Sequence, residues 1–189
     1  LKTQVRMKDM ESAMQYSVSN IDLESNKMIM YVGKTHAPGG YLWVFPKGNR
    51  FANIGIGISG KYSKHKSAKR YLDEFMASEY PHAAILTTMC GGVPCAKPMK
   101  KPIADRLMLV GDAAHQINPM TGGGIVSGMT AGWIAGQVAA DAVQKNDVSA
   151  KMLNNYSDTM WKTFGKDYER FYSIKEAVHS LTDKDLDYI

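Results

Sequence analysis

The segment Leu107–Ile125, LMLVGDAAHQINPMTGGGI, constrains the fold more than any other part of the chain. An apolar run of strand length, Leu107–Val110, ends at Gly111 and Asp112, and a loop stiffened by Pro119 then leads to a glycine-rich helix start. In α/β folds, ligands bind in crevices at the carboxyl ends of such strands. The segment therefore predicts an α/β fold with a ligand site at this strand-to-helix crossing.

The same segment indicates what chemistry this site can hold. Asp112 can accept hydrogen bonds from sugar or sugar-alcohol hydroxyls, and Gly122–Gly124 leave the first N–H groups of the helix uncovered. Such N–H groups favour an anion, or a carbonyl that gains negative charge. A flavin fits this demand, because its N1/C2=O edge becomes anionic on reduction. The structural alternative is a tight turn before an ordinary helix, and the combined spacing favours the flavin.

Composition bounds the class of protein. The 189 residues are 44% apolar and 22% charged, which is typical of a globular chain with one domain or one and a half. Two cysteines and the lack of a secretory signal favour a location in the reducing cytoplasm.

The net charge of +5 permits attraction to anionic head groups but does not indicate nucleic-acid binding. The chain begins at Leu1 without an initiator Met, and we expect it to be a piece of a longer protein.

One uncharged run, Gly122–Ala140, raises the question of a membrane span. Small residues recur in it at every fourth position, and glycine, alanine, serine, threonine and glutamine make up most of the run. It is therefore less apolar than a span requires. We expect a buried helix of a globular domain, with the small residues allowing close backbone approach.

Apolar patterns predict the remaining elements, with a Gly/Pro-rich crossing over Gly91–Pro102. Strands are predicted over Gln15–Val18, Met28–Val32, Tyr41–Phe45, Phe51–Ile58 and Ile85–Met89. Helices are predicted over Ala68–Met76 and Ser149–Tyr172, with Thr182 and Asp185 capping a short last helix.

Tyr41–Phe45 and Phe51–Ile58 are predicted to form a hairpin whose register stays open. A two-residue loop would put Tyr41, Trp43 and Phe45 on the face of Ile54 and Ile56. A three-residue loop would instead set the aromatic residues beside Asn53, Gly55 and Gly57.

Gly55–Gly60 spells G-x-G-x-x-G after a strand, as in a dinucleotide-binding fingerprint. The third glycine of that fingerprint must lie in the helix that receives the pyrophosphate. Here the helical pattern begins only near Ala68. We interpret these glycines as room for a neighbouring group.

Two motifs resemble one enzyme family. The sequences GDAA at Gly111–Ala114 and NPMTGGGI at Asn118–Ile125 are similar to the second FAD-binding motif of geranylgeranyl reductases. Flavin hydroxylases of the p-hydroxybenzoate type share a looser form of it. The sequences PGGYLWVFPK at Pro38–Lys47 and ANIGIG at Ala52–Gly57 resemble the reductases specifically, above all their archaeal lipid-reducing members.

The resemblance implies an FAD enzyme that saturates C=C bonds in geranylgeranyl chains of isoprenoid (archaeal ether) lipids by hydride transfer from reduced flavin. It implies that Asp112 holds the ribityl chain, that Gly111 belongs to the same cofactor site, and that Tyr41, Trp43 and Phe45 line the lipid cavity. For these three aromatic residues, ordinary sheet core is the structural alternative. The residues implied to line the isoalloxazine are Pro119, Gly122, Gly123, Gly124 and Ile125.

The implied fold is α/β, with an antiparallel substrate-domain sheet plus the C-terminal strand and helix of a Rossmann-like FAD-binding domain, as in p-hydroxybenzoate hydroxylase. Residues 1–104 are expected to form the substrate-binding sheet domain with one helix. Residues 105–145 are expected to form the C-terminal part of the FAD-binding domain, and residues 146–189 a C-terminal helical segment. The family's N-terminal Rossmann βαβ unit has no counterpart here, so the chain resembles a C-terminal fragment.

The implied partners are an isoprenoid lipid and an electron donor, NAD(P)H or ferredoxin, between which the sequence does not choose. We expect a cytoplasmic protein that is compatible with peripheral membrane contact and binds no nucleic acid.

Two rival functions stay open. One is an FAD monooxygenase, because His115 after GDAA is common among the hydroxylase relatives; the other is a lipid-binding module without redox activity.

Other polar residues receive structural interpretations. We expect the ring of His115 to be satisfied by backbone groups, and Cys90 and Cys95 to be buried and inert. Their spacing does not suit a metal site, and none is expected. No catalytic residue is assigned, and the proton donor could be water or a thiol. Solvation is expected for the basic cluster of Lys61, Lys64, Lys66, Lys69 and Arg70.

Overall fold

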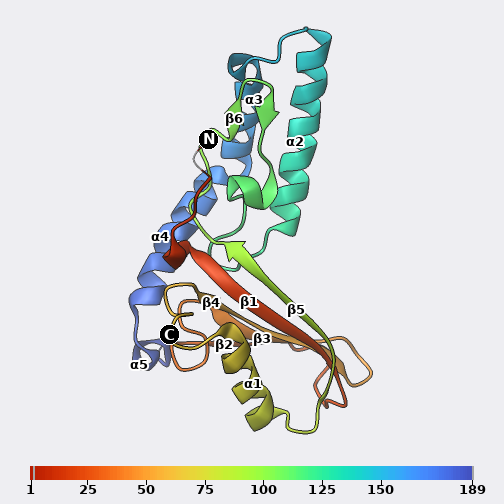
Figure 1. Cartoon of the computed structure of the whole chain (residues 1–189), viewed down its shortest axis with the longest axis vertical. Helices are drawn as coiled ribbons and strands as arrows, with labels where there is room; N and C mark the ends of the chain where they lie inside the picture. The colour runs from red at the N-terminus through yellow and green to blue at the C-terminus, as the bar shows by residue number, and fades with distance from the viewer. Residues whose placement is uncertain (2, 189) are drawn as a thin grey trace. The chain divides into compact units, whose positions relative to one another are not determined.

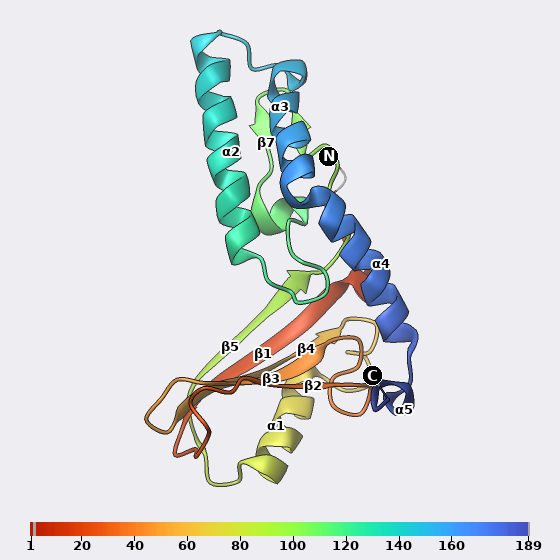
Figure 2. The ribbon, with the colours of Figure 1, turned by 180° about the vertical axis from the view of Figure 1, so that it is seen from behind.

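The computed structural model describes residues 1 and 3–188. The chain forms two compact units, which we call the sheet unit (residues 7–93 and 178–189) and the helical unit (residues 1–6 and 94–177). The fold is mixed α/β with an antiparallel sheet, as predicted (Figures 1 and 2). The predicted functional domains, 1–104, 105–145 and 146–189, divide the chain at other positions and stay a prediction.

The sheet unit contains five strands in the spatial order β2-β3-β4-β1-β5. A short 3₁₀ turn, η1 (Met7–Asp9), precedes the first strand. The strands are β1 (Met10–Ser19), β2 (Ile29–Val32), β3 (Tyr41–Pro46), β4 (Phe51–Ser59) and β5 (Ala84–Pro94). The helices of this unit are α1 (Ala68–Glu79) and α5 (Asp183–Leu186).

One face of the sheet forms the core of this unit. Tyr16 of β1, Leu42 of β3 and Ile56 of β4 are almost fully buried, and every second residue of these strands points the same way. Helix α1 covers this face with Leu72 and its apolar neighbours (Figure 1). The helix begins where the Ser67 hydroxyl accepts a hydrogen bond from the Arg70 N–H at 3.2 Å.

The β3–β4 hairpin adopts the second of the two predicted registers. The Lys47 N–H donates to the Phe51 carbonyl at 2.8 Å, so the loop is Gly48–Arg50. All three loop residues have positive φ values, of 70°, 39° and 64°. In consequence Trp43 lies opposite Gly55, and Tyr41 and Phe45 lie on the same face, away from the α1 core.

The helical unit is built on two long helices that lie side by side in both views (Figures 1 and 2). Ile134 and Val138 of α2 pack with Tyr156 and Met160 of α3 in its core. The elements are β6 (Ile103–Ala104), β7 (Leu107–Met108), the 3₁₀ turn η2 (Gly111–Ala114), α2 (Ile125–Gln144), α3 (Ala150–Met160), the π turn η3 (Trp161–Gly165) and α4 (Lys166–Ser180).

Several predicted boundaries are wrong. The strand expected over Leu107–Val110 is only the two-residue β7, because Val110 leads directly into the turn at Gly111, whose φ is 65°. Strand β5 continues into the expected crossing and ends at Pro94. The expected single helix over Ser149–Tyr172 is α3, η3 and α4, and it extends to Ser180.

The prediction of a buried helix over Gly122–Ala140 is wrong for one side of α2. Trp133 is 65% exposed, and a Cβ added to Gly136 would meet no atom within 4 Å. The close approach expected of the small residues is found only near the start of α2, where a Cβ added to Gly128 would lie 3.9 Å from the Gly111 Cα. None of the helices in the described residues combines the length and the hydropathy of a transmembrane segment.

Candidate functional site

The Gly111–Asp112 turn is built from backbone hydrogen bonds. The His115 N–H donates to the Asp112 carbonyl, and the Gln116 N–H donates to the Gly111 carbonyl, both at 3.0 Å. The positive φ of Gly111 and the left-handed conformation of His115 close this turn. The turn leaves the Asp112 side chain exposed, where its carboxylate can accept hydrogen bonds.

The loop before α2 is closed on Asn118. The Asn118 carbonyl accepts from the Gly122 N–H at 2.9 Å, and its side-chain oxygen accepts from the Met120 N–H at 3.0 Å. Gly124 is the N-cap of α2 and makes no side-chain capping bond. The N–H groups of the first turn, which have no partner within the helix, are thus available to a ligand.

These two segments come together. A Cβ added to Gly124 would lie 3.5 Å from Asp112 Oδ1 and 3.1 Å from Ile117 Cγ1. Gly123 and Ile125 are exposed, Gly111 and Gly122 are partly exposed, and Pro119 is buried. The structure therefore brings Asp112 and the start of α2 to one place, while the contacts of these residues with a flavin stay a prediction.

Gln116 connects the parts of this site and is absent from the sequence-based prediction. Its fully buried side chain accepts from the Gly111 N–H and donates to the Tyr156 hydroxyl, both at 2.7 Å. The Ser127 hydroxyl of α2 donates to the Gln116 carbonyl at 2.5 Å. Gln116 thus ties the turn to α2 and α3. The sequence contained one signal for this role of Gln116, which is an amide residue between the Gly111–Asp112 turn and the apolar residue Ile117.

Tyr156 completes this network. Its hydroxyl donates to the Leu109 carbonyl at 2.7 Å while it accepts from Gln116. Burial is the main cause that raises the pKa of the Tyr156 hydroxyl above its ordinary value. The hydroxyl therefore keeps its proton and holds the segment before Gly111 in place.

The second candidate group is the aromatic row, Tyr41, Trp43 and Phe45, on the uncovered face of the sheet unit. The ring centroids lie 5.6 Å apart between Tyr41 and Trp43, and 6.2 Å apart between Trp43 and Phe45. The Trp43 indole N–H donates to the Gln15 side-chain oxygen at 3.2 Å. All three rings are partly exposed and none belongs to the core cluster, so the row presents apolar surface.

Gly55 forms the floor under this row. A Cβ at Gly55 would lie 2.3 Å from Trp43 Cζ2. Any side chain at this position would therefore displace the indole ring of Trp43. Gly55 and Gly57 both lie within β4, and the next helix begins only at Ala68. The interpretation of these glycines as room for a neighbour, rather than as a nucleotide-binding fingerprint, is confirmed.

The other polar predictions have mixed outcomes. The buried His115 ring nitrogen Nε2 lies 3.0 Å from the Thr3 carbonyl, as expected of a histidine satisfied by backbone. Cys95 is buried, but the prediction for Cys90 is wrong, because it lies exposed on the edge strand β5. Among residues 1 and 3–188, no group of three potential ligands could hold a metal ion.

The basic cluster is largely paired. Lys66 and Arg70 contact Glu74, and Lys69 contacts Asp73 at 2.6 Å. The hydrogen bond from Lys66 is the main cause that lowers the pKa of the Glu74 carboxyl. These exposed pairs contribute little stability, and they leave less positive charge for a head group than the sequence suggests.

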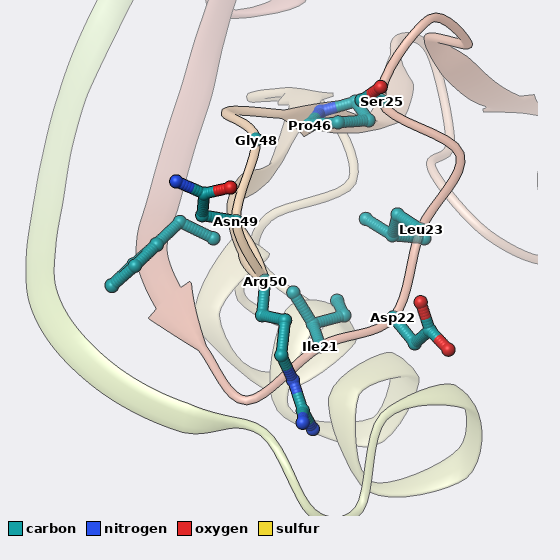
Figure 3. Close-up of a pocket in the computed structure, with 9 residues that line it drawn as sticks. Ile21, Asp22, Leu23, Ser25, Pro46, Gly48, Asn49 and Arg50 are labelled. Atoms are coloured by element: carbon teal, nitrogen blue, oxygen red, sulfur yellow. The ribbon is translucent and has the colours of Figure 1, made fainter.

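A small pocket of about 50 Å³ lies beside the hairpin turn of the sheet unit. Figure 3 shows Ile21 and Leu23 on one side of it and Asn49 and Arg50 on the other. Ligand pockets typically measure about 300–1,000 Å³. This pocket is therefore too small to be the main ligand site.

Comparison with solved structures defines the class of fold. A flavin-dependent brominase matches with a TM-score of 0.63 and 14% identity, covering 94% of this chain and 51% of the brominase chain. At this identity the likeness concerns the fold alone. The chain thus has the fold of a flavoenzyme class that also includes halogenases and a probable FAD-dependent monooxygenase.

Closer matches define the family. Residues 9–93 match the model of the geranylgeranyl reductase catalytic domain. A digeranylgeranylglycerophospholipid reductase of Methanococcoides burtonii is 43% identical over 99% of this chain and 46% of its own length. A geranylgeranyl bacteriochlorophyll reductase-like protein from Thermoplasma acidophilum matches with a TM-score of 0.94 and 36% identity, covering 100% of this chain and 48% of that one. The chain belongs to the geranylgeranyl reductase family, and it spans about half the length of the relatives it matches.

Proposed function

We propose that this chain is part of an FAD-dependent reductase that saturates C=C bonds in geranylgeranyl chains of archaeal ether lipids. The observation that carries the proposal is the aromatic row over its glycine floor. It offers a long, partly exposed apolar surface to an isoprenoid chain, in a segment that matches the reductase catalytic domain.

The residues of the helical unit fit the flavin part of FAD. The exposed Asp112 carboxylate suits a ribityl hydroxyl, and hydrogen bonds to charged groups contribute about 1.5–3 kcal/mol. Gly122, Gly123 and Gly124 carry no side chain that would keep a planar ring from the N–H groups of α2. Pro119 and Ile125 complete the proposed ring-binding set, with Gly111 at the ribityl side. When bound and reduced, the flavin supplies a hydride to one carbon of the C=C bond, and a proton completes the other carbon.

The protein's own contribution at this site is binding and charge stabilisation. The N–H groups and dipole at the start of α2 favour negative charge nearby. Asp112 binds a hydroxyl and fixes its position, and the Gln116 network holds Asp112 relative to α2. A site held in this way does not need to reorganise when charge develops.

In the sheet unit, Tyr41, Trp43 and Phe45 bind the prenyl chain by apolar contact. Burial of apolar surface contributes about 25 cal/mol per Å², and the hydrogen bond from Trp43 to Gln15 fixes the central ring. An ordered chain with water excluded from one side is a favourable geometry for hydride transfer.

This proposal assigns residues 1–104 to substrate binding, 105–145 to flavin binding and 146–189 to a helical segment. Its partners are an isoprenoid lipid and either NAD(P)H or ferredoxin, with peripheral contact at a membrane surface. A flavin-dependent monooxygenase is the second candidate, favoured by the shared fold and by His115 directly after GDAA.

Product analysis on the intact protein encoded by the gene separates these two functions. Under anaerobic conditions with a chemical reductant, we expect a geranylgeranyl lipid to gain the mass of two hydrogens for each saturated bond. An oxygen-dependent product with added oxygen, or peroxide release without saturation, would instead support the monooxygenase.

A further inference from the structure

A larger pocket lies at the outer edge of the sheet unit. It measures about 400 Å³, within the range of ligand pockets, and lies between β2, the loop that follows it and α5. Its apolar lining includes Met30, Val32 and Leu186. All of its lining residues belong to the sheet unit.

The pocket continues the aromatic row. Met30 lies opposite Trp43, and Val32 lies opposite Tyr41, so both side chains point to the same face as the rings. They are 52% and 56% exposed although both are large and apolar. Met30 and Val32 therefore lie beside the aromatic row and also line the pocket, so apolar surface continues from the row to the pocket.

Helix α5 forms a fixed wall of this pocket. The Asp183 carboxylate accepts hydrogen bonds from the N–H groups of Lys34 and Thr35, at 2.5 and 2.9 Å, and from the Thr35 hydroxyl at 2.6 Å. The chain approaches so closely at Gly33 that an added Cβ would lie 3.0 Å from Asp183 Oδ1, at a φ of 105°. A capping box between Thr182 and Asp185 stabilises the short helix.

The charges of the lining disfavour an anionic head group. Asp183 and Asp187 contribute carboxylates, Thr35 and His36 also line the pocket, and the lining contains no lysine or arginine. A phosphate would be repelled by these carboxylates. The apolar end of a chain has no charge to be repelled.

We propose that this pocket binds the distal end of the prenyl chain, and that Leu186 limits the chain length that fits. This inference rests on the proposed function, because it takes the aromatic row as the surface for the nearer part of the chain. The wall position of Leu186 makes α5 a determinant of specificity rather than of the reduction itself.

Photolabelling tests this inference independently of turnover. The probe is geranylgeranyl phosphate with a diazirine at the end of the chain far from the phosphate, added to the intact protein and mapped by mass spectrometry. We expect labelling of the segments that contain Met30–Val32 or Leu186. Labelling confined to other segments would overturn the inference.

Two variants sharpen the test. Leu186→Trp fills the pocket and should abolish labelling of these segments, as should Val32→Trp if the first variant does not fold. Met28→Trp is the control, because Met28 is 76% exposed and does not line the pocket. Undiminished labelling in a folded pocket-filling variant would also overturn the inference. Turnover of a geranylgeranyl lipid by wild-type protein tests the proposed function separately, so a labelled pocket without turnover would contradict only that function.

Discussion

Gly55→Ala should remove the floor of the aromatic row. The new Cβ would lie 2.3 and 2.5 Å from Trp43 Cζ2 and Cε2, and 2.9 Å from the Met14 carbonyl oxygen. Because the backbone of β1 cannot yield at low cost, the indole must tilt, and its hydrogen bond to Gln15 is strained or lost. Overpacking of this kind typically costs about 1–3 kcal/mol, and each kcal/mol lowers Tm by about 2–4 °C in a domain of about 150–250 residues.

Gly57→Ala is the matched control for this prediction. Gly57 lies on the same strand and the same face, but its added Cβ would meet only Glu11 Oε2, at 3.1 Å. This contact is with the end of a flexible side chain, so we expect a clearly smaller loss. Urea denaturation of the intact protein measures the free energy of unfolding for both variants. Because the chain has three tryptophans, the difference in fluorescence between each variant and wild type is taken as the Trp43 signal. Equal losses for the two variants, or an unchanged Trp43 signal in Gly55→Ala, would refute the role of Gly55 as the floor.

Three further predictions concern the candidate site and α5. Asp112→Ala should weaken FAD binding to the intact protein by about one to two decades, since about 1.5–3 kcal/mol is lost at tenfold per 1.4 kcal/mol; unchanged affinity in a titration would contradict the assignment of Asp112. Gln116→Leu removes the hydrogen bonds of the Gln116 side chain to the Gly111 N–H and the Tyr156 hydroxyl, at a cost of about 1–3 kcal/mol per buried group. It should weaken FAD binding more than Tyr156→Phe, which keeps the bond between Gln116 and Gly111. Equal FAD affinities of the two variants would contradict the role of Gln116 in positioning the Gly111–Asp112 turn. The Thr35 hydroxyl is the main cause that lowers the pKa of the Asp183 carboxyl. The contribution of this carboxylate to stability is therefore present above about pH 4 and is lost as the pH falls through the lowered value, so the stability of wild type should approach that of Asp183→Asn in acid. A difference in unfolding free energy between the two proteins that stays constant from neutral pH into acid would refute this.

Local patterns predicted much of the fold. The strands around Tyr16 and Ile56, helix α1 and the cap at Thr182 all follow from short-range periodicity and capping chemistry, and the structure contains them. The pairing of β1 with β4, rather than with its neighbour in sequence, depends on contacts between distant segments. No local pattern contains that information.

The hairpin register shows why one ambiguity could not be resolved from sequence. Both loop lengths agree with the residues, and the choice depends on positive φ at Asn49 and Arg50 as well as at Gly48. Non-glycine residues rarely adopt that conformation, so the shorter glycine-containing turn was an equally reasonable prediction. The consequence is large, because a change of one residue moves Trp43 to the opposite face.

The candidate site was predictable in part. The motif around Asp112 and Gly124 predicted that two loop segments meet, and a Cβ at Gly124 would lie within 3.5 Å of the carboxylate. Gln116 was missed because an amide residue in a loop is most often exposed, and only the fold shows it to be fully buried. Cys90 was misjudged for the converse reason, since edge strands expose residues that apolar patterns predict to be buried.

The most direct test of the central claim is whether a prenyl lipid reoxidises the bound flavin. The intact protein would be loaded with FAD, reduced anaerobically and mixed with a geranylgeranyl lipid while the flavin absorbance is followed. We predict that oxidised flavin returns in step with saturation of the lipid, and that Trp43→Ala slows this return without lowering the FAD content. A reduced flavin that stays reduced with the lipid present and is reoxidised only by oxygen would contradict the account.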